Sequence, residues 1–476
     1  MIPISTEAAL ADLDMLGQQP LVNMYTPLCF FYPDSHEDDT RPYLQDTPTI
    51  LKKGFERLAE AFPWIAGQVV GESADSGLTK IVPFPSHPIP ELKIQDHGPK
   101  HPSFDRLYNS NFAFGLIDER DLCGKESHIG QQKNATTEFP VLVAQLNYIR
   151  GGIILAFVTH HSTCDITGMG SILSLFDKAC RNVPFTDDDI RIGNRRLDSP
   201  IHLLEGEIDI TNNPRLRMQV TPPSSSSHIA PAMLPPPTGA TWVYFAFPAT
   251  SLSSLKSLAT SQIPENGPAY ISTDDVLTAL VWQRIVLARL QHKSPSPQPT
   301  ICARAIDVRP YLKLPRNYPG MIQNETYTPL PPATLVQAPL GVIASLLRQD
   351  LKPKELARDT EALTTLMTHD DDKSKYSLAC GVDWSRDVMI SSWSKVAGYQ
   401  MEFGLGAKPV KVLRPRFPPV PGLVFCMPKR ADGGIDVAVC LRDEELVRLR
   451  GDEVWVRMCR EARVEKQKGS EEEDAD

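Results

Sequence analysis

A Pro- and Ser-rich segment near the middle of the chain constrains the possible folds more than any other feature. Residues 221–239 read TPPSSSSHIAPAMLPPPTG. Proline and serine disfavour both helix and strand, so this composition is typical of an extended linker. We therefore predict two parts of similar size, an N-terminal domain at 1–220 and a C-terminal domain at 240–464, which the segment at 221–239 connects.

The composition predicts a globular protein with a large core. Of the 476 residues, 41% are hydrophobic and 22% are charged, and a chain of this length can bury a sizeable apolar interior. No apolar run reaches the roughly 18 residues of a membrane-spanning helix, so no membrane span is expected. The acidic residues Glu7, Asp12 and Asp14 near the N-terminus argue against a secretory signal.

The cysteines and the charge exclude two further classes of protein. The nine cysteines include no CxxC pair, so we expect reduced thiols in a cytoplasmic protein and predict no metal ligands. The net charge is −9, and the five acidic residues within 471–476 supply more than half of it. A mildly acidic body argues against nucleic acid as a partner, and the tail at 465–476 is expected to be disordered.

Hydrophobic patterns predict helices that alternate with strands in both halves, which is typical of an α/β fold. In the first half we expect helices at 51–62 and 169–179 and a hairpin of two strands at 141–146 and 153–158. In the second half we expect strands at 241–247, 388–392, 423–427 and 435–441, a capped helix from Ser272 to about 291, and a last helix over 444–461 that is broken at Gly451.

The stretch HHSTCD, residues 160–165, follows the strand predicted at 153–158. A histidine at the end of a rigid strand is well placed to act as a general base, because its ordinary pKa lies near neutrality. Asp165 could fix the turn or orient His161. From this motif alone, a core histidine with satisfied hydrogen bonds is as good an interpretation. A metal pair is disfavoured because adjacent side chains of an extended chain point to opposite sides.

Three further motifs lie in the second half. EFGLG at 402–406 contains Gly404 and Gly406, whose lack of a side chain allows a tight turn. SSW at 391–393 lies just upstream of it, and DVR at 307–309 lies further back. Each of the three is unremarkable when it is considered alone.

Together and in this order, the motifs resemble the BAHD family of CoA-dependent acyltransferases. The marks of the family are an HxxxD motif, here His161 to Asp165, and a DFGWG motif near the C-terminus, here EFGLG. Further similarities are FPWIAG at 62–67, STDDVLTALVW at 272–282, DVR at 307–309 and NYPGMIQN at 317–324. Leu405, where most members have Trp, is similar to the branch of fungal trichothecene 3-O-acetyltransferases, whereas Glu402 departs from the family's Asp.

The resemblance implies a fold and a reaction. The fold is α/β, with two similarly sized domains, each like chloramphenicol acetyltransferase, and an active-site channel between them. Acetyl-CoA is the implied co-substrate, no cofactor is permanently bound, and the partner is a small hydroxylated acceptor. The expected activity is transfer of acetyl to a hydroxyl of a fungal secondary metabolite similar to a trichothecene, by direct attack in a ternary complex. The family default is a monomer, and we expect a cytoplasmic location.

The resemblance also implies roles for individual residues. His161 is the general base and the indole N–H of Trp393 a donor to the oxyanion, while Cys164 is a bystander. Asp165 pairs with Arg309 and is structural, as are Gly404 and Gly406.

For CoA we assign Ser272 and Thr273, since a helix N-terminus favours anions, and also Ser391. The basic residues Lys408, Lys411, Arg414 and Arg416 fit two interpretations, contacts to nucleotide phosphates or a solvated basic face.

Two other functions fit parts of the sequence. A condensation domain of nonribosomal peptide synthesis shares the fold and an HHxxxDG motif, but Asp165 is followed by Ile166 and not by Gly. A non-catalytic relative that binds a terpenoid is the second alternative. Turnover with free acetyl-CoA as the donor would separate the enzyme from both.

Overall fold

The structure is a computed structural model that describes residues 11–34, 43–71, 78–127, 138–195, 200–221, 239–290 and 298–463. Most of the predicted linker, residues 222–238, lies outside these ranges, and so does the predicted tail. Residues 128–137, the larger part of a polar stretch at 124–137, are also outside them. The predictions made for the linker and the tail are therefore untested.

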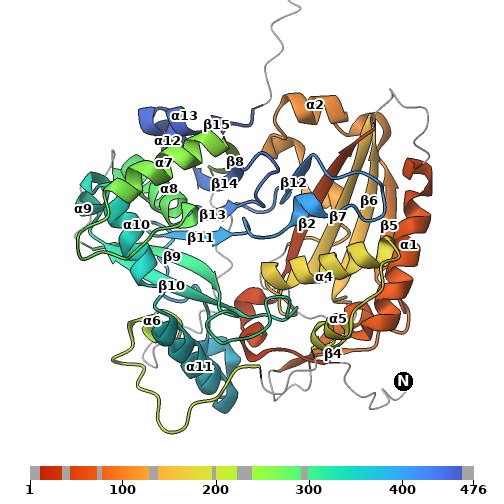
Figure 1. Cartoon of the computed structure of the whole chain (residues 1–476), viewed down its shortest axis with the longest axis horizontal. Coiled ribbons are helices and arrows are strands. Elements are labelled where there is room, and N and C mark those ends of the chain that lie inside the picture. The colour runs from red at the N-terminus through yellow and green to blue at the C-terminus, as the bar shows by residue number, and fades with distance from the viewer. Residues whose placement is uncertain are drawn as a thin grey trace, which may run out of the picture.

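The first half contains a five-stranded sheet built around the predicted hairpin (Figure 1). In spatial order its strands are β12 (Lys411–Leu413), β2 (Tyr25–Pro33), β7 (Gly152–His160), β6 (Leu142–Ile149) and β5 (Glu91–Asp96). Every residue of β7 is buried, which explains its continuous apolar run. A small second sheet consists of β1 (Ala11–Asp12), β4 (Thr79–Val82) and β3 (Gln68–Gly71).

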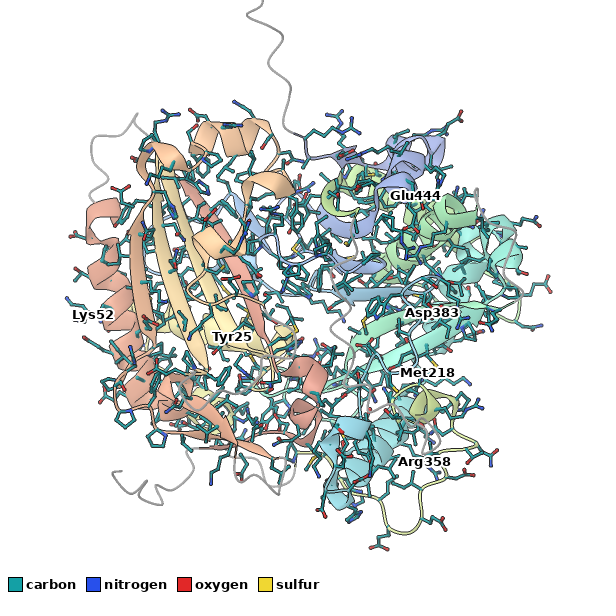
Figure 2. All side chains as sticks on the ribbon, turned by 180° about the vertical axis from the view of Figure 1, so that it is seen from behind. Tyr25, Lys52, Met218, Arg358, Asp383 and Glu444 are labelled. Atoms are coloured by element: carbon teal, nitrogen blue, oxygen red, sulfur yellow. The ribbon has the colours of Figure 1, made fainter. Side chains whose placement is uncertain are left out.

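Two helices cover the first sheet and confirm the predicted amphipathic segments. They are α1 (Tyr43–Ala61) and α4 (Ile166–Cys180), which pack against each other. Phe55 of α1 stacks on Phe176 of α4 with ring centroids 4.2 Å apart. In Figure 2 the exposed Lys52 of α1 points outward, whereas the buried Tyr25 lies in the interior at the start of β2.

The second half contains a seven-stranded mixed sheet. In spatial order its strands are β10 (Gln323–Leu330), β9 (Thr300–Asp307), β11 (Val388–Ser392), β13 (Leu423–Cys426), β14 (Ile435–Arg442), β8 (Ala240–Phe247) and β15 (Arg460–Glu461). The four strands predicted here are confirmed. The C-terminal end of the predicted last helix is wrong, because residues 460–461 pair with β8 as a strand.

The remaining helices lie mostly in the second half, on the outer side of its sheet or below it (Figure 1). They are α7 (Ala249–Ser261), α8 (Thr273–Leu290), α9 (Pro332–Gln337), α10 (Leu340–Gln349), α11 (Pro353–His369), α12 (Asp443–Arg450) and α13 (Glu453–Met458). The first half adds α2 (Phe104–Asn109), α3 (Glu119–Leu122), α5 (Asp187–Gly193) and α6 (Pro214–Arg217). Gly451 lies between α12 and α13, which confirms the predicted break. None of the helices in the described ranges combines the length and the apolar content needed to cross a bilayer.

The two faces of the second sheet bury against different partners. Because side chains alternate along a strand, Val243 and Phe245 of β8 pack with α7, α8 and α10 in one core. Trp242 and Tyr244 point the other way and join the core of the first half. Tyr244 stacks on Phe114 with ring centroids 4.4 Å apart. The inner face of this sheet is therefore the surface on which the first half packs.

One strand of the second half also joins the sheet of the first half. β12 follows β11 in the chain, yet it pairs with β2 of the first sheet, with Leu413 opposite Cys29. The domain limits at 1–220 and 240–464 stay a prediction, and this short strand of the second half lies in the sheet of the first.

Candidate active site

His161 lies in the turn between the buried strand β7 and the helix α4. Its backbone N–H donates to the Met24 carbonyl at 2.7 Å, which continues the ladder between β2 and β7. The ring nitrogen Nδ1 lies 2.9 Å from the Cys164 carbonyl oxygen. A carbonyl can only accept, so Nδ1 carries the proton, and Nε2 keeps its lone pair. The half-buried ring is thus held in the tautomer that a general base needs.

The surroundings of His161 keep its ring neutral. Burial is the largest influence and lowers the pKa of His161 below the ordinary 6.5. The hydrogen bond to the Cys164 carbonyl and the charge of Asp165 oppose this effect, while the charge of Arg414 adds to it. At neutral pH the imidazole is therefore ready to accept a proton.

The neighbouring His160 has a different environment. It is 1% exposed, and its ring packs edge-on against Tyr25 and Phe139 with centroid separations of 5.1 and 6.0 Å. His160 belongs to the packed core below the turn, so the two adjacent histidines are not a joint ligand pair.

The Asp165 carboxylate binds partners other than the His161 ring and connects the two halves. One carboxylate oxygen accepts the Gly168 N–H at 2.7 Å and caps α4. Both oxygens accept from the Arg309 guanidinium, at 2.9 and 3.1 Å, and the Ile322 N–H donates to one of them at 2.8 Å. The predicted pair of Asp165 and Arg309 is present, and both side chains are buried.

Arg309 is held in turn by the stretch that precedes β10. Its Nε donates to the Tyr318 carbonyl at 2.8 Å, and Nη2 donates to the Gly320 carbonyl at 2.6 Å. Asp307 accepts from Nη1 at 2.9 Å. The DVR and NYPG motifs thus form one structural unit, which holds the His161 turn from the second half.

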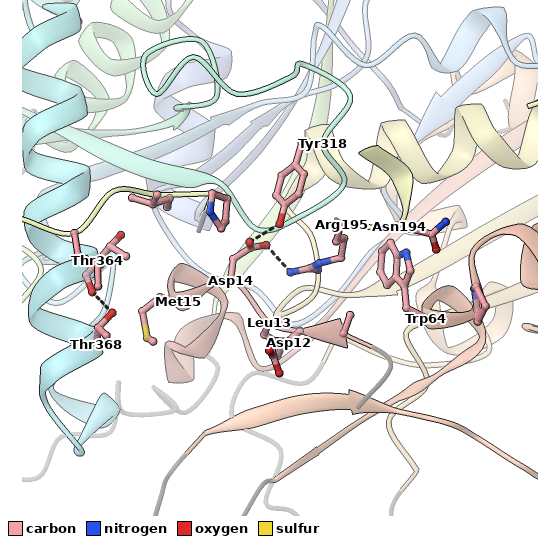
Figure 3. A pocket seen from close by; sticks show the side chains of 15 residues that line it. Asp12, Leu13, Asp14, Met15, Trp64, Asn194, Arg195, Tyr318, Thr364 and Thr368 are labelled. Atoms are coloured by element: carbon pink, nitrogen blue, oxygen red, sulfur yellow. Dashed lines mark hydrogen bonds and ion pairs between the residues drawn. The ribbon is translucent and has the colours of Figure 1, made fainter. Parts of the chain in front are cut away.

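A second buried ion pair, which the sequence did not suggest, joins Arg195 and Asp14 (Figure 3). Arg195 donates to the Thr163 carbonyl at 2.9 Å and to Asp14 at 2.7 Å. Asp14 also accepts from the Tyr318 hydroxyl at 2.7 Å and from the Met321 N–H at 2.9 Å. Asp14, Arg195 and Tyr318 line a cavity of about 590 Å³, but their polar groups bind one another, so we assign them to support of the turn.

Trp393 and Ser391 lie together at the end of β11. The Trp393 indole is 3% exposed, and its N–H donates to the Ser391 hydroxyl at 3.1 Å. Its ring packs against Phe425 with centroids 5.1 Å apart. Because the Ser391 oxygen accepts the indole N–H, the proton of the Ser391 hydroxyl can be donated to another acceptor.

Ser272 and Thr273 stand at the start of α8, where the sequence predicted a cap. The Ser272 hydroxyl accepts the Asp275 N–H at 3.2 Å, and Asp275 accepts the Ser272 N–H at 2.7 Å. Asp275 is also paired with Arg304 and Arg348. The Ser272 side chain therefore caps the start of α8, and contact of Ser272 or Thr273 with CoA stays a prediction.

The EFGLG loop packs on the far end of α4. Asp177 accepts the N–H groups of Glu402 and Phe403 at 2.8 and 2.7 Å. Asp177 follows Asp165 by twelve residues, which corresponds to about 18 Å along a helix. Gly404 has φ +71°, and a Cβ there would lie 2.9 Å from the Cys180 carbonyl. The loop joins the halves at a distance from the His161 turn.

Both interpretations of the basic residues are wrong for Lys411 and Arg414. Lys411 is buried in β12 and pairs with Asp436 of β14 at 2.9 Å. Arg414 is buried among aromatic rings. Only Lys408 and Arg416 are exposed, and Arg416 pairs with Asp118. The pattern of charges along the chain cannot reveal this, because Lys411 is buried in a strand that pairs with β2 and Arg414 is buried just after that strand.

Two family models match the chain. A model described as the trichothecene 3-O-acetyltransferase-like N-terminal domain matches residues 24–180. A model described as the Transferase family matches residues 125–453.

Individual relatives are similar over nearly their whole length. The O-acetyltransferase dmxR13 of Cryptosporiopsis sp. is 40% identical over 453 residues, covering 94% of this chain and 96% of the relative. The trichothecene 3-O-acetyltransferase TRI101 of Fusarium sporotrichioides is 37% identical over 458 residues, with coverage of 94% and 96%. The crystal structure of F. sporotrichioides TRI101 complexed with coenzyme A and T-2 superposes with a TM-score of 0.86 at 35% identity, covering 95% of this chain and 99% of that one.

Proposed function

The chain belongs to the Transferase family of BAHD acyltransferases, and from this we propose that it transfers an acetyl group from acetyl-CoA to a hydroxyl of a fungal secondary metabolite. The coarser part of this statement rests on full-length relatives: the chain is an acetyltransferase of the trichothecene 3-O-acetyltransferase type. The finer part concerns the acceptor and the mechanism. For the acceptor we propose a sesquiterpenoid similar to a trichothecene, because a relative was crystallised with T-2 as well as coenzyme A.

The observation that carries the mechanism is the tautomer of His161. Because Nδ1 donates to the Cys164 carbonyl, the unprotonated Nε2 can take the proton of an acceptor hydroxyl as its oxygen attacks the thioester carbonyl. A positioned base of this kind is worth about 10²–10⁴-fold in rate. The C–O bond forms, the C–S bond breaks, and His161 returns the proton to the departing CoA sulfur.

The developing oxyanion needs a hydrogen-bond donor. We assign this task to Trp393 together with Ser391, whose hydroxyl accepts the indole N–H and can itself donate to an oxygen in the site. Loss of one donor to an oxyanion typically slows an enzyme by about 10²–10³-fold. Ser272, Thr273 and Ser391 stay our proposed contacts for CoA. We further propose a monomer that works in the cytoplasm, and light scattering would test the oligomeric state.

The decisive experiment measures release of CoA thiol from acetyl-CoA in the presence of a panel of hydroxylated fungal terpenoids. We expect release that depends on the acceptor, and we expect His161→Gln to abolish it. His369→Gln, which changes an exposed histidine of α11, is the matched control and should keep full activity.

The kinetic pattern tests the mechanism separately. Direct transfer in a ternary complex gives intersecting initial-rate lines, whereas an acyl-enzyme gives parallel lines. Tight CoA binding without thiol release for any acceptor would contradict the proposed acceptor class. Absence of CoA binding would contradict the proposed donor.

A further inference from the structure

Arg414 lies where the two halves meet, immediately after β12. The Tyr244 hydroxyl of β8 donates to the Arg414 carbonyl at 2.6 Å. The preceding residue, Leu413, pairs with Cys29 of β2 in the other sheet. The backbone at Arg414 is therefore held from both halves, and its side chain is fixed in the interior between them.

The guanidinium of Arg414 is a buried cation without a carboxylate partner in the described part of the chain. The residue is 1% exposed. Nη2 donates to the Ser127 hydroxyl at 2.9 Å, and Nε finds no acceptor among the described residues. Arg304 and Arg309 are as deeply buried, yet each contacts two carboxylates.

A buried charge of this kind lowers the stability of the fold, and its presence therefore indicates a functional role. The acid that acts most strongly on Arg414 is Glu119 of α3. Burial raises the pKa of Glu119, so this acid is itself a weak counter-charge.

Aromatic rings surround the guanidinium in place of carboxylates. Its central carbon lies 4.0 Å from the centroid of Phe417, 5.3 Å from that of Phe425 and 5.8 Å from that of Trp393. A cation over a ring face is attracted by the ring quadrupole, and more strongly when water is excluded. Arg414 therefore packs near Trp393, whose N–H donates to the Ser391 hydroxyl that we propose as the donor to the oxyanion.

The same charge acts on His161. The charged groups that influence the His161 ring are Asp165, which favours its protonation, and Arg414, which opposes it. Around Arg414 itself, the titratable groups are Glu119, Tyr244, Cys123 and Cys29. Arg414 thus lies within electrostatic reach of His161 and packs against Trp393.

We propose that Arg414 is a positioning residue of the acyl-transfer site, which orients Trp393 by stacking and imposes a positive potential where negative charge develops on the thioester oxygen. This inference rests on the proposed function. The positive potential has a second consequence, since it adds to the effect of burial and opposes protonation of His161. A residue with a purely structural role would have no effect on the titration of His161.

The test compares the variants Arg414→Met, which removes the charge at similar volume, and Arg414→Lys, which keeps it. The His161 pKa is measured by NMR titration of protein labelled at its 11 histidines, with the His161 signal assigned by its loss in His161→Gln. We expect Arg414→Met to raise the His161 pKa and Arg414→Lys to leave it close to the wild-type value. In steady-state kinetics, kcat of Arg414→Met should fall roughly tenfold with little change in KM for acetyl-CoA.

Two controls make the result decisive. Arg289→Met removes another arginine whose side chain is largely buried, on the outer helix α8, and should leave the His161 pKa unchanged. If Arg414→Met does not fold, Arg414→Gln replaces it, because it can still donate to Ser127. An identical His161 pKa in wild type and in the uncharged variant would overturn the inference. The titration needs no turnover. A wild type that fails to transfer acetyl would therefore refute the proposed function, while the effect of Arg414 on the His161 pKa could still be measured.

Discussion

A single hydrogen bond decides which nitrogen of His161 can act as the base, and burial sets the pH range in which that nitrogen is unprotonated. A base works only when neutral, and burial lowers the His161 pKa below 6.5. We therefore predict that kcat/KM falls at acid pH with a midpoint below 6.5, as the pH drops through the lower folded-state pKa. The unfolded chain binds a proton first, so the free energy of unfolding should decrease in the same range. An acid limb centred at or above 6.5 in the pH profile would contradict this.

Cys164 touches His161 through its carbonyl oxygen and not through its thiol. Burial raises the pKa of that thiol to about 11, so it carries almost no thiolate at neutral pH. We predict that Cys164→Ala keeps kcat/KM within about threefold and loses about 1 kcal/mol in the free energy of unfolding. A folded but inactive Cys164→Ala, or an acetylated Cys164 found by mass spectrometry, would require a covalent mechanism instead.

At the scale of elements, the start of α4 depends on the pair of Asp165 and Arg309. Removing one partner leaves a buried charge unpaired, which typically costs about 3–5 kcal/mol. It also frees the turn that holds His161, and a displacement of about 1 Å can reduce activity by about 10²-fold. We predict such losses for Asp165→Ala and for Arg309→Ala.

A double-mutant cycle measures this coupling, and the double variant should lose less than the two singles together. The alternative is a direct electrostatic role for Asp165. It would be supported if Asp165→Ala folded normally, kept its CoA affinity and only shifted its pH optimum.

The EFGLG loop offers a matched pair of glycines on one element. Gly404 and Gly406 have φ of +71° and +68°, but only at Gly404 would a Cβ meet other atoms. We predict a loss of about 1 kcal/mol for Gly406→Ala from backbone strain and a larger loss for Gly404→Ala. Denaturant unfolding measures both. Activity of the folded variants should change by less than about twofold, and a drop in kcat without loss of stability would place the loop at the chemistry.

At the scale of the whole molecule, β12 of the second half completes the sheet of the first half. We therefore predict that the stability of each half depends on the presence of the other. A fragment of residues 1–221 leaves the edge of β2 unpaired and exposes the rings that pack on Trp242 and Tyr244. We expect this fragment alone to aggregate, and to form a soluble complex when coexpressed with residues 239–476. Size-exclusion chromatography and denaturant unfolding provide the test. Cooperative unfolding of a monomeric 1–221 fragment would show that the first half is autonomous.

Elements with a local cause were predictable from the sequence. The apolar run before His160, the capping box at Ser272 and the break at Gly451 each depend on residues within one or two turns of the chain. The prediction was wrong where a local pattern competed with pairing, as at residues 460–461, which join β8 instead of continuing a helix. The support from Asp14 and Arg195 had no signal at all, since an isolated Asp and an isolated Arg 181 residues apart form no motif.

The sequence by itself determined the family, the helices and strands that carry the motifs, and the identity of the histidine in the HxxxD turn, because these depend on local order and spacing. Only the tertiary structure decided that Nδ1 of His161 is the protonated nitrogen, that Trp393 donates to Ser391, and that Arg414 is buried. The first two are hydrogen bonds between residues three and two positions apart, whose geometry the sequence pattern does not show, and the burial of Arg414 depends on contacts between segments far apart in the chain. No periodicity records such contacts, because they exist only once the two sheets have packed against each other.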